Sequence, residues 1–476
     1  MTFSSIPFLF YFLPLFIGFY FLVPWKNAAL LAGSLLFYAW GEPVFIFLLM
    51  ISLGFNHAIG TIIARNRSKP ALIVGIVLNL AALGWFKYAG FLAGALSEGF
   101  SAIGIPLSLE IENHLPLGIS FYTFQAISFL IDLYRRDADR PRGLVDTALY
   151  ISMFPQLIAG PIVRYKSVAD QLVSRTHSVE KFSSGARQFI LGLAQKVLLA
   201  NTFAVAADNA FDAAALQGLT PAAAWVGLFA YTFQIFFDFA GYSNMAIGMG
   251  RMFGFELPKN FNFPYTAQSI TEFWRRWHMT LSQWFRDYLY IPLGGNRVSA
   301  LRTYFNLWVV FLLCGLWHGA AITFVLWGAY HGAFLVIERA GLKKYLDRGP
   351  RAIRHFYLIM IAALSWVPFR AESLDDTLTY YAALIGVGAE NNAMTTDNLA
   401  PDGLGLVFVI GAIVALWPLV EKIGEFTGRQ INIQGAPAML RAITPVSTQI
   451  ILAFLFIASA ASIAGGGYNP FIYFRF

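Results

Sequence analysis

A polytopic α-helical membrane protein is the fold class that this sequence predicts. Apolar residues make up 58% of the 476 residues and charged residues only 12%, about half the charge of an ordinary soluble domain. The stretches 1–25, 303–337 and 442–474 contain no Asp, Glu, Lys or Arg. A helix needs about 20 mostly apolar residues to cross a bilayer, and a soluble fold cannot hide this much hydrocarbon. We therefore expect an all-α bundle embedded in lipid.

The charge-poor segments between polar breaks give the expected crossings in chain order. Helix is the expected conformation of each, because backbone groups in lipid must pair within their own segment. The first stretch lacks a basic region and an evident cleavage site, so we expect a retained first span. The pattern predicts about ten to twelve membrane-embedded helices in one domain over residues 1–476. The segments are 7–24, 27–41, 43–64, 70–86, 115–131, 147–163, 188–207, 221–237, 303–337, 355–369, 403–420 and 447–464.

Basic clusters separate these segments. They lie from Arg65 to Lys69, from Arg135 to Arg142 and from Arg339 to Arg354. Because Lys and Arg prefer the cytoplasmic side of a membrane, each cluster is expected in a cytoplasmic loop. The only cysteine, Cys314, lies in an apolar run and has no partner for an intramolecular disulfide.

Residues 269–297 form an expected amphipathic segment at the membrane interface. Ser269 and Glu272 have the spacing of a capping box, which predicts a helix that begins there. At 100° per residue one face is apolar and the other polar, with His278 near the border. The arginines of the polar face either meet an anionic ligand or are solvated at the membrane surface. The apolar face holds Phe273, Trp277, Leu281, Trp284 and Tyr288, and the polar face holds Arg275, Arg276, Gln283, Arg286 and Asp287.

His318 is the strongest candidate for chemistry. It lies deep in the uncharged run 303–337 between Gly315 and Gly319, where an ionisable side chain is costly and indicates function. The structural alternative is a neutral histidine that is hydrogen-bonded across a helix interface. That alternative is favoured more strongly for His331, which lies in the same run.

Other chemistries find little support in the sequence. It has no Gly-rich phosphate loop and no His or Cys cluster with metal-ligand spacing, and a hydrophobic chain makes nucleic acid a poor partner. A buried base beside a basic face suits transfer of a group from an anionic cytosolic donor to a hydroxyl. The alternative is a transporter or flippase for a lipid-linked sugar, which usually adds carboxylates inside the membrane. Asp132 and Asp238 are the nearest such carboxylates, and both can be placed at span ends.

Two motifs resemble the hallmarks of the membrane-bound O-acyltransferases. The first is FWRRWHMTLS at 273–282, followed by WFRDY at 284–288, and the second is GLWHG at 315–319. Supporting segments lie at 115–122, 154–161 and 291–297, and the resemblance covers residues 3 to 370. Within the family the chain most resembles the members that take part in O-acetylation of alginate or of peptidoglycan. The D-alanyl transferases of teichoic acid synthesis share the same hallmarks.

The resemblance implies a helical bundle around a central funnel, with His318 as the catalytic base at its narrow point. His278 is expected to position the donor or to stabilise charge. The donor is expected to be cytosolic acetyl-CoA, with no metal, and its phosphates are expected to meet Arg275, Arg276 and Arg286, although lipid phosphates attract the same arginines. The expected partners are a periplasmic O-acetyltransferase of the esterase-like type and a polysaccharide acceptor, at the bacterial inner membrane.

The aromatic tail at 469–476, NPFIYFRF, resembles a short tail of some of these export systems. The resemblance implies that Tyr473 receives the acyl group. The alternative is an interfacial aromatic anchor that ends in an arginine.

Overall fold

The computed structural model describes residues 2–106, 108–109, 111, 114–216, 218–388, 393–399, 403–416, 438–470 and 472. Over these residues the secondary structure is helical, apart from one β-bridge between Leu219 and Met394. The all-α fold class that the sequence predicts is confirmed.

Seven helical stretches of the described chain are long and apolar enough to cross a membrane, and two shorter apolar helices, Pro7–Leu22 and Leu404–Leu416 (α21), accompany them. The protein is therefore a multi-pass membrane protein, while the predicted ten to twelve crossings are not confirmed. The seven stretches are Ile46–Asn66 (α3), Lys69–Ala102 (α4, Lys69–Leu83, and α5, Ala89–Ala102), Val179–Leu216 (α10, Val179–Ala194, and α11, Asn201–Leu216), Pro221–Met252 (α12), Ala300–His318 (α15), Arg351–Arg370 (α18) and Ser447–Ala464 within α23 (Ala438–Ala464).

Several predicted crossings are short or broken. The segment 147–163 leaves the helix at Met153, just before Pro155, which has no N–H to continue a hydrogen-bond ladder. The run 303–337 divides between α15 and α16 at residues 319–321. The shorter helices are α1 (Leu13–Leu22), α2 (Lys26–Gly41), α6 (Ile119–Arg135), α7 (Leu144–Ser152), α8 (Phe154–Leu157), α9 (Ala169–Val173), α13 (Ile270–Trp274), α14 (Met279–Phe285), α16 (Ile322–Ile337), α17 (Lys343–Leu346), α19 (Leu374–Leu384) and α20 (Thr396–Leu399).

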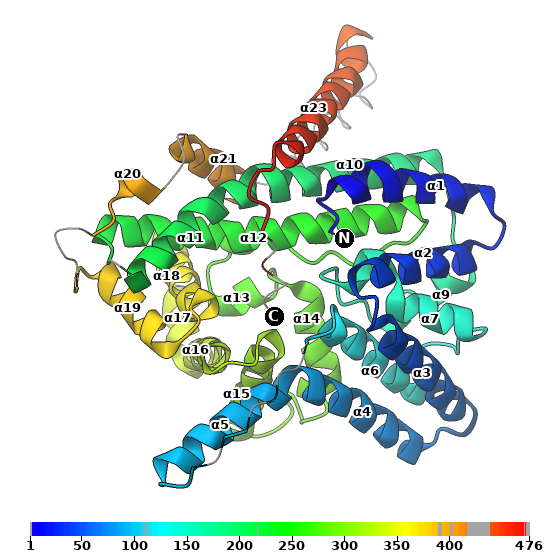
Figure 1. The fold of residues 1–476 in the computed structure, drawn as a ribbon, viewed down its shortest axis with the longest axis horizontal. Coiled ribbons are helices and arrows are strands. Elements are labelled where there is room, and N and C mark those ends of the chain that lie inside the picture. The colour runs from blue at the N-terminus through cyan, green and yellow to red at the C-terminus, as the bar shows by residue number, and fades with distance from the viewer. Residues whose placement is uncertain are drawn as a thin grey trace.

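The helices surround the short helices α13 and α14, which lie near the centre of the view in Figure 1. The long helices α10, α11 and α12 run along one side, the N-terminal helices α2, α3, α4, α6 and α7 lie on another, and α15 to α19 close the remainder, while α5 extends toward the lower left of the view. Because α13 and α14 carry the first histidine motif, the bundle encloses this motif.

Glycines let α10 and α12 pack with their backbones in contact. A Cβ at Gly185 would lie 2.5 Å from the carbonyl oxygen of Gly248, and a Cβ at Gly192 would lie 2.5 Å from that of Gly241. Small residues at such spacing are typical of close helix pairs in membranes. This contact fixes α12, which in turn presents residues to the centre of the bundle.

The segment 269–297 is not the continuous amphipathic helix that the periodicity predicts. Ser269 caps α13 as expected, because its side chain accepts the N–H of Glu272. The helix then ends at Trp274, and His278 has a left-handed φ of 40° before α14 begins at Met279. The π-helical turn Arg286–Tyr290 follows α14.

The break arises because a neighbouring segment pairs with the backbone. The N–H of Met279 donates to the carbonyl of Asn260 at 2.8 Å, and the N–H of Asn262 donates to the carbonyl of Arg276 at 2.9 Å. These bonds replace the helical ladder between α13 and α14. All five residues of the predicted apolar face are buried, as that face requires. Asp287 of the predicted polar face is buried as well, so the division into two faces is only partly correct.

Candidate active site

His318 is the last residue of α15 and is almost fully enclosed. Its side chain is part of an aromatic cage, with ring centroids 5.0 Å from Trp327 and 5.3 Å from Phe369. Although the residue is only 3% exposed, neither ring nitrogen has a hydrogen-bond partner among the described residues. The alternative of a histidine bonded across a helix interface is therefore not what the described structure shows. Two free nitrogens in a buried place are available to a substrate.

Two glycines bring α15 and α16 together just before His318. A Cβ at Gly315 would overlap the carbonyl oxygen of Phe324, and a Cβ at Gly328 would overlap that of Phe311. The Cα atom of Gly328 would lie 3.3 Å from a Cβ at Gly315. Gly315, the first glycine of the GLWHG motif, is thus required for the close crossing that fixes the end of α15.

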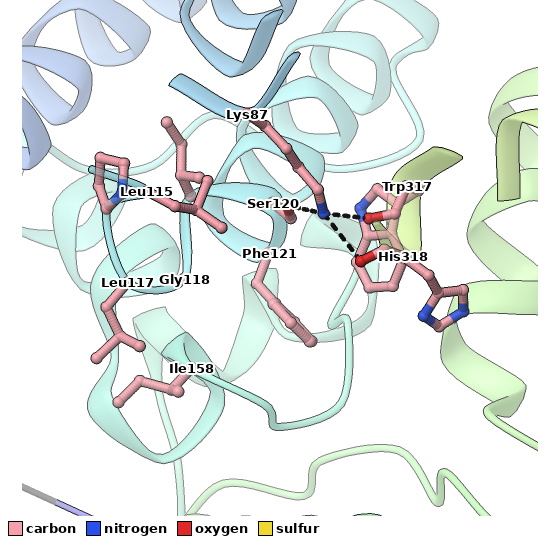
Figure 2. A pocket seen from close by; sticks show the side chains of 11 residues that line it. Lys87, Leu115, Leu117, Gly118, Ser120, Phe121, Ile158, Trp317 and His318 are labelled. Carbon is pink, nitrogen blue, oxygen red and sulfur yellow. Dashed lines mark hydrogen bonds between the residues drawn. The ribbon is translucent and has the colours of Figure 1, made fainter. Parts of the chain in front are cut away.

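Lys87 and Tyr88 bind the carbonyl groups at the end of α15. Lys87 Nζ donates to the carbonyl oxygens of Trp317 at 2.5 Å and His318 at 3.2 Å, and to Ser120 Oγ at 3.3 Å (Figure 2). The hydroxyl of Tyr88 donates to the carbonyl of Leu316 at 2.7 Å. The last carbonyls of a helix have no partner within it, and a cation there also meets the negative end of the helix dipole. These contacts hold the backbone of His318 in place.

We expect Lys87→Met to lower both stability and turnover. Methionine keeps the apolar stem but leaves carbonyls at the end of α15 unpaired in a buried place, which costs about 1–3 kcal/mol of unfolding free energy. Thermal unfolding and turnover of the purified variant measure the two effects. Lys69→Met, at the exposed start of α4, is the matched control. A Lys87→Met protein that matches this control in both measurements would show that Lys87 does not position His318.

His278 lies in the turn between α13 and α14, and its ring centroid is 6.4 Å from that of His318. The backbone N–H of Thr280 donates to Asn260 Oδ1 at 3.3 Å, so this atom must be the amide oxygen. His278 Nδ1 lies 3.1 Å from the same oxygen and is therefore protonated. Burial lowers the pKa of His278 to about 3, so the ring is neutral and Nε2 keeps its lone pair. Nε2 has no partner among the described residues.

His331 of α16 has a structural contact. The indole N–H of Trp274 donates to His331 Nδ1 at 3.3 Å, which joins α13 to α16. This agrees with the structural interpretation that the sequence favours for His331. It also makes His331 a useful comparison for the two histidines above.

The three arginines that were expected to meet the donor differ in their surroundings. Arg275 is exposed. Arg276 pairs with Glu272 at 2.8 Å. Arg286 lies 2.7 Å from Asp287, which also pairs with Arg164. Burial alone would raise the pKa of Asp287, but the hydrogen bond from Arg286 and the two positive charges hold this pKa below its usual range. Arg275 is therefore the least engaged of the three.

A small pocket of about 70 Å³ lies on the Lys87 side of His318. The segment 115–121 and Ile158 form its apolar wall, and the end of α15 closes it. Figure 2 shows the imidazole of His318 pointing away from this wall and from Lys87. The backbone of His318 thus borders the pocket, while its ring belongs to the group that contains His278.

Tyr473 lies outside the described residues, and so do its neighbours Phe471 and Phe474. Ile472 is described, and its backbone N–H donates to Asp238 Oδ2 at 2.9 Å. The expectation that Asp238 lies at a span end is wrong, because α12 continues past residue 238 through a charge-poor stretch to Met252. Asp132, in contrast, does lie near the end of α6.

Sequence reasoning missed several residues of this region. Lys87 is a charge inside an apolar stretch of 34 residues, which is a recognised sign of function and was available in the sequence. Lys196 carries the same signal, because it lies inside the apolar stretch Val179–Leu216. Asn260 carries no comparable signal, because its role depends on its contact with His278 in another segment.

Comparison with known proteins identifies the family and several relatives of the chain. Residues 134–367 match the model of the membrane-bound O-acyltransferase family. The chain is 42% identical to the probable alginate O-acetylase AlgI of Pseudomonas putida, over all of both chains. It is 36% identical to the peptidoglycan O-acetyltransferase of Helicobacter pylori, over 81% of this chain and 80% of that one. It is also 28% identical to the teichoic acid D-alanyltransferase of Bacillus subtilis, over 58% of this chain and 75% of that one.

The helical membrane bundle encloses His318 and His278, and three of their four ring nitrogens have no partner among the described residues. The chain belongs to the membrane-bound O-acyltransferase family. The protein is therefore a membrane-bound O-acyltransferase, which decides against the transporter alternative.

Proposed function

We propose that the protein transfers acetyl groups from cytosolic acetyl-CoA toward the outer face of the bacterial inner membrane, for O-acetylation of a cell-surface polysaccharide. The observation that carries the proposal is the buried pair of His318 and His278, whose unpaired nitrogens suit acid–base chemistry. Similarity to proteins named for alginate and peptidoglycan O-acetylation supports an alginate-like polymer or peptidoglycan as the acceptor.

His318 acts as the general base in this proposal. It removes the proton of an acceptor hydroxyl, whose oxygen attacks the thioester carbonyl of acetyl-CoA. The carbon–sulfur bond breaks, and the CoA thiolate takes the proton from the imidazolium, so that free CoA and an acetyl ester result. The lone pair of His278 Nε2 accepts a hydrogen bond from bound acetyl-CoA or from the protonated His318 ring.

Contacts link the three basic clusters of the sequence to α6 or to the segment 269–297, which supports a cytoplasmic site for the donor. Lys and Arg prefer that side, and phosphate groups bind arginine well. Arg275 offers the freest charge, and Arg276 and Arg286 add to the field despite their carboxylate partners. Arg67 lies over the ring of Tyr134, Arg135 lies over the ring of Tyr288, and Arg339 donates to Asn296.

Tyr473 is the proposed acceptor within the chain. A phenol has a pKa of about 10 and needs a base to become a nucleophile at neutral pH. Acetyl on Tyr473 would then pass to a periplasmic O-acetyltransferase of the esterase-like type, and the phenol would be restored. This divides one transfer across the membrane into two shorter steps. Support comes from Ile472, the preceding residue, which is bound inside the bundle.

Purified protein in lipid vesicles, supplied with acetyl-labelled acetyl-CoA, tests the proposal. We expect release of free CoA from acetyl-CoA, and no comparable release from the thioester D-alanyl-CoA, which carries the acyl group that the D-alanyltransferase relatives are named for. Faster use of the D-alanyl thioester would overturn the acetyl assignment. Movement of label across the vesicle membrane without any free CoA would overturn acyl transfer itself.

A further inference from the structure

The last described residues of the chain enter the bundle beside a buried ion pair. Lys196 Nζ lies 2.7 Å from Asp238 Oδ1, and both side chains are only 2% exposed. Lys196 lies in the π-helical turn Gln195–Ala200 between α10 and α11, and Asp238 lies midway along α12. In Figure 1 the chain that follows α23 runs down across α12 toward the centre of the bundle. The acid–base chemistry above does not use this pair.

Each member of the ion pair binds one backbone group of the C-terminal segment. Lys196 Nζ donates to the carbonyl oxygen of Pro470 and to Asn201 Oδ1 at 2.8 Å. Asp238 Oδ2 accepts the backbone N–H of Ile472 at 2.9 Å. The Lys196 ammonium thus binds a backbone acceptor, and the Asp238 carboxylate binds a backbone donor two residues further along the segment.

These bonds solve a problem that any non-helical chain meets inside a membrane protein. Backbone groups at membrane depth must be paired, and residues 469–470 are not helical. A buried ion pair is itself costly and rarely more stable than an apolar pair of the same volume. The presence of this ion pair beside the middle of α12 is explained if the two charges bind the C-terminal segment.

Side chains of the segment are bound as well. Asn469 Nδ2 donates to the carbonyl oxygen of Ser4 at 3.0 Å, and Asn469 Oδ1 accepts from Asn201 Nδ2 at 3.1 Å. The Tyr468 hydroxyl donates to Asp208 at 2.7 Å. The Ile472 side chain is buried. The contacts therefore bind the backbone of the segment and also its particular side chains.

We propose that Lys196, Asp238 and Asn201 form a receptor for the chain's own C-terminal segment and hold it for reaction. The receptor lies beside the histidines, because Phe239, the residue after Asp238, contacts the His278 ring with centroids 4.6 Å apart. Lys196 and Asp238 are positioning residues: they fix Ile472, and in the proposed function the next residue, Tyr473, reacts with the help of His318. This last step rests on the proposed function, whereas binding of the segment does not.

Hydrogen exchange of the full-length protein tests the receptor without any acyl chemistry. The variant Lys196→Met/Asp238→Leu removes both charges and keeps the volume, so it leaves no unpaired buried charge. We expect at least about tenfold faster amide exchange in the C-terminal peptide, because Pro470 and Ile472 lose their partners. Turnover should fall by a similar factor while KM for acetyl-CoA stays unchanged.

Two further variants complete the experiment. Lys343→Met/Asp347→Leu removes an exposed ion pair of α17 and should leave exchange of the C-terminal peptide unchanged. Asn469→Ala, which cannot leave a buried charge, should speed this exchange in the same direction as the double variant. Wild-type exchange in both Asn469→Ala and a folded double variant would overturn the receptor. A released segment with undiminished turnover would leave the receptor standing and would contradict the role of Tyr473 instead.

Discussion

Replacing His318 with alanine is expected to lower turnover at least about 10²-fold, the usual contribution of a general base. The loss should appear in release of CoA and in acetylation of the polymer alike. Protein abundance should stay normal, because neither ring nitrogen of His318 binds another described residue, so that no buried partner loses a hydrogen bond. Immunodetection of membrane fractions and turnover of the purified variant measure the two quantities.

His331 provides the matched control for this substitution. It is equally buried, and it lies on the neighbouring helix α16, but its Nδ1 accepts from Trp274. His331→Gln keeps an acceptor there and should retain most of the activity. His278→Ala should show an intermediate loss, since His278 assists and does not take the proton. A folded His318→Ala protein with near-normal turnover would refute the assignment of the base.

Tyr473→Phe is expected to abolish acetylation of the polysaccharide without lowering the amount of protein. The substitution keeps the aromatic ring and removes only the oxygen that is proposed to carry acetyl, so it separates chemistry from packing. Quantification of acetyl esters on polymer from cells that carry only the variant measures the effect.

Tyr345→Phe is the comparison for loss of a phenol. Tyr345 lies on α17, outside the C-terminal segment, and is exposed, so this variant should retain acetylation. Full acetylation by the Tyr473→Phe variant would show that the tail serves only as an anchor. Acetyl would then have to pass directly from CoA to the substrate of the partner enzyme.

The sequence predicts the fold through composition and uncharged runs, and these suffice for a helical membrane bundle. The periodicity of residues 269–297 identifies the buried aromatic side but not the break at His278. That break depends on hydrogen bonds to Asn260 and Asn262, which no local pattern contains. The number of crossings is equally hard to predict, because Pro155 and the turn at 319–321 interrupt otherwise apolar runs.

The site could be predicted only in part, for similar reasons. His318 and His278 are evident from their motifs, and the structure brings their rings together. The contacts that position them come from distant segments: Lys87 reaches the end of α15, and Lys196 and Asp238 bind residues at the end of the chain. Asp238 shows the limit most clearly, because its place in a helix of 32 residues depends on where that helix ends.

A single-turnover reaction with labelled acetyl-CoA tests most directly whether His318 activates the acceptor hydroxyl. Wild-type protein and His318→Ala are mixed with excess donor and quenched, and acetyl on the C-terminal peptide is measured by mass spectrometry. Equilibrium binding of acetyl-CoA to both proteins shows that each still takes up the donor. We predict that acetyl accumulates on the wild-type peptide and is absent from His318→Ala. Acetyl that forms on the His318→Ala peptide at the wild-type rate would contradict the mechanism.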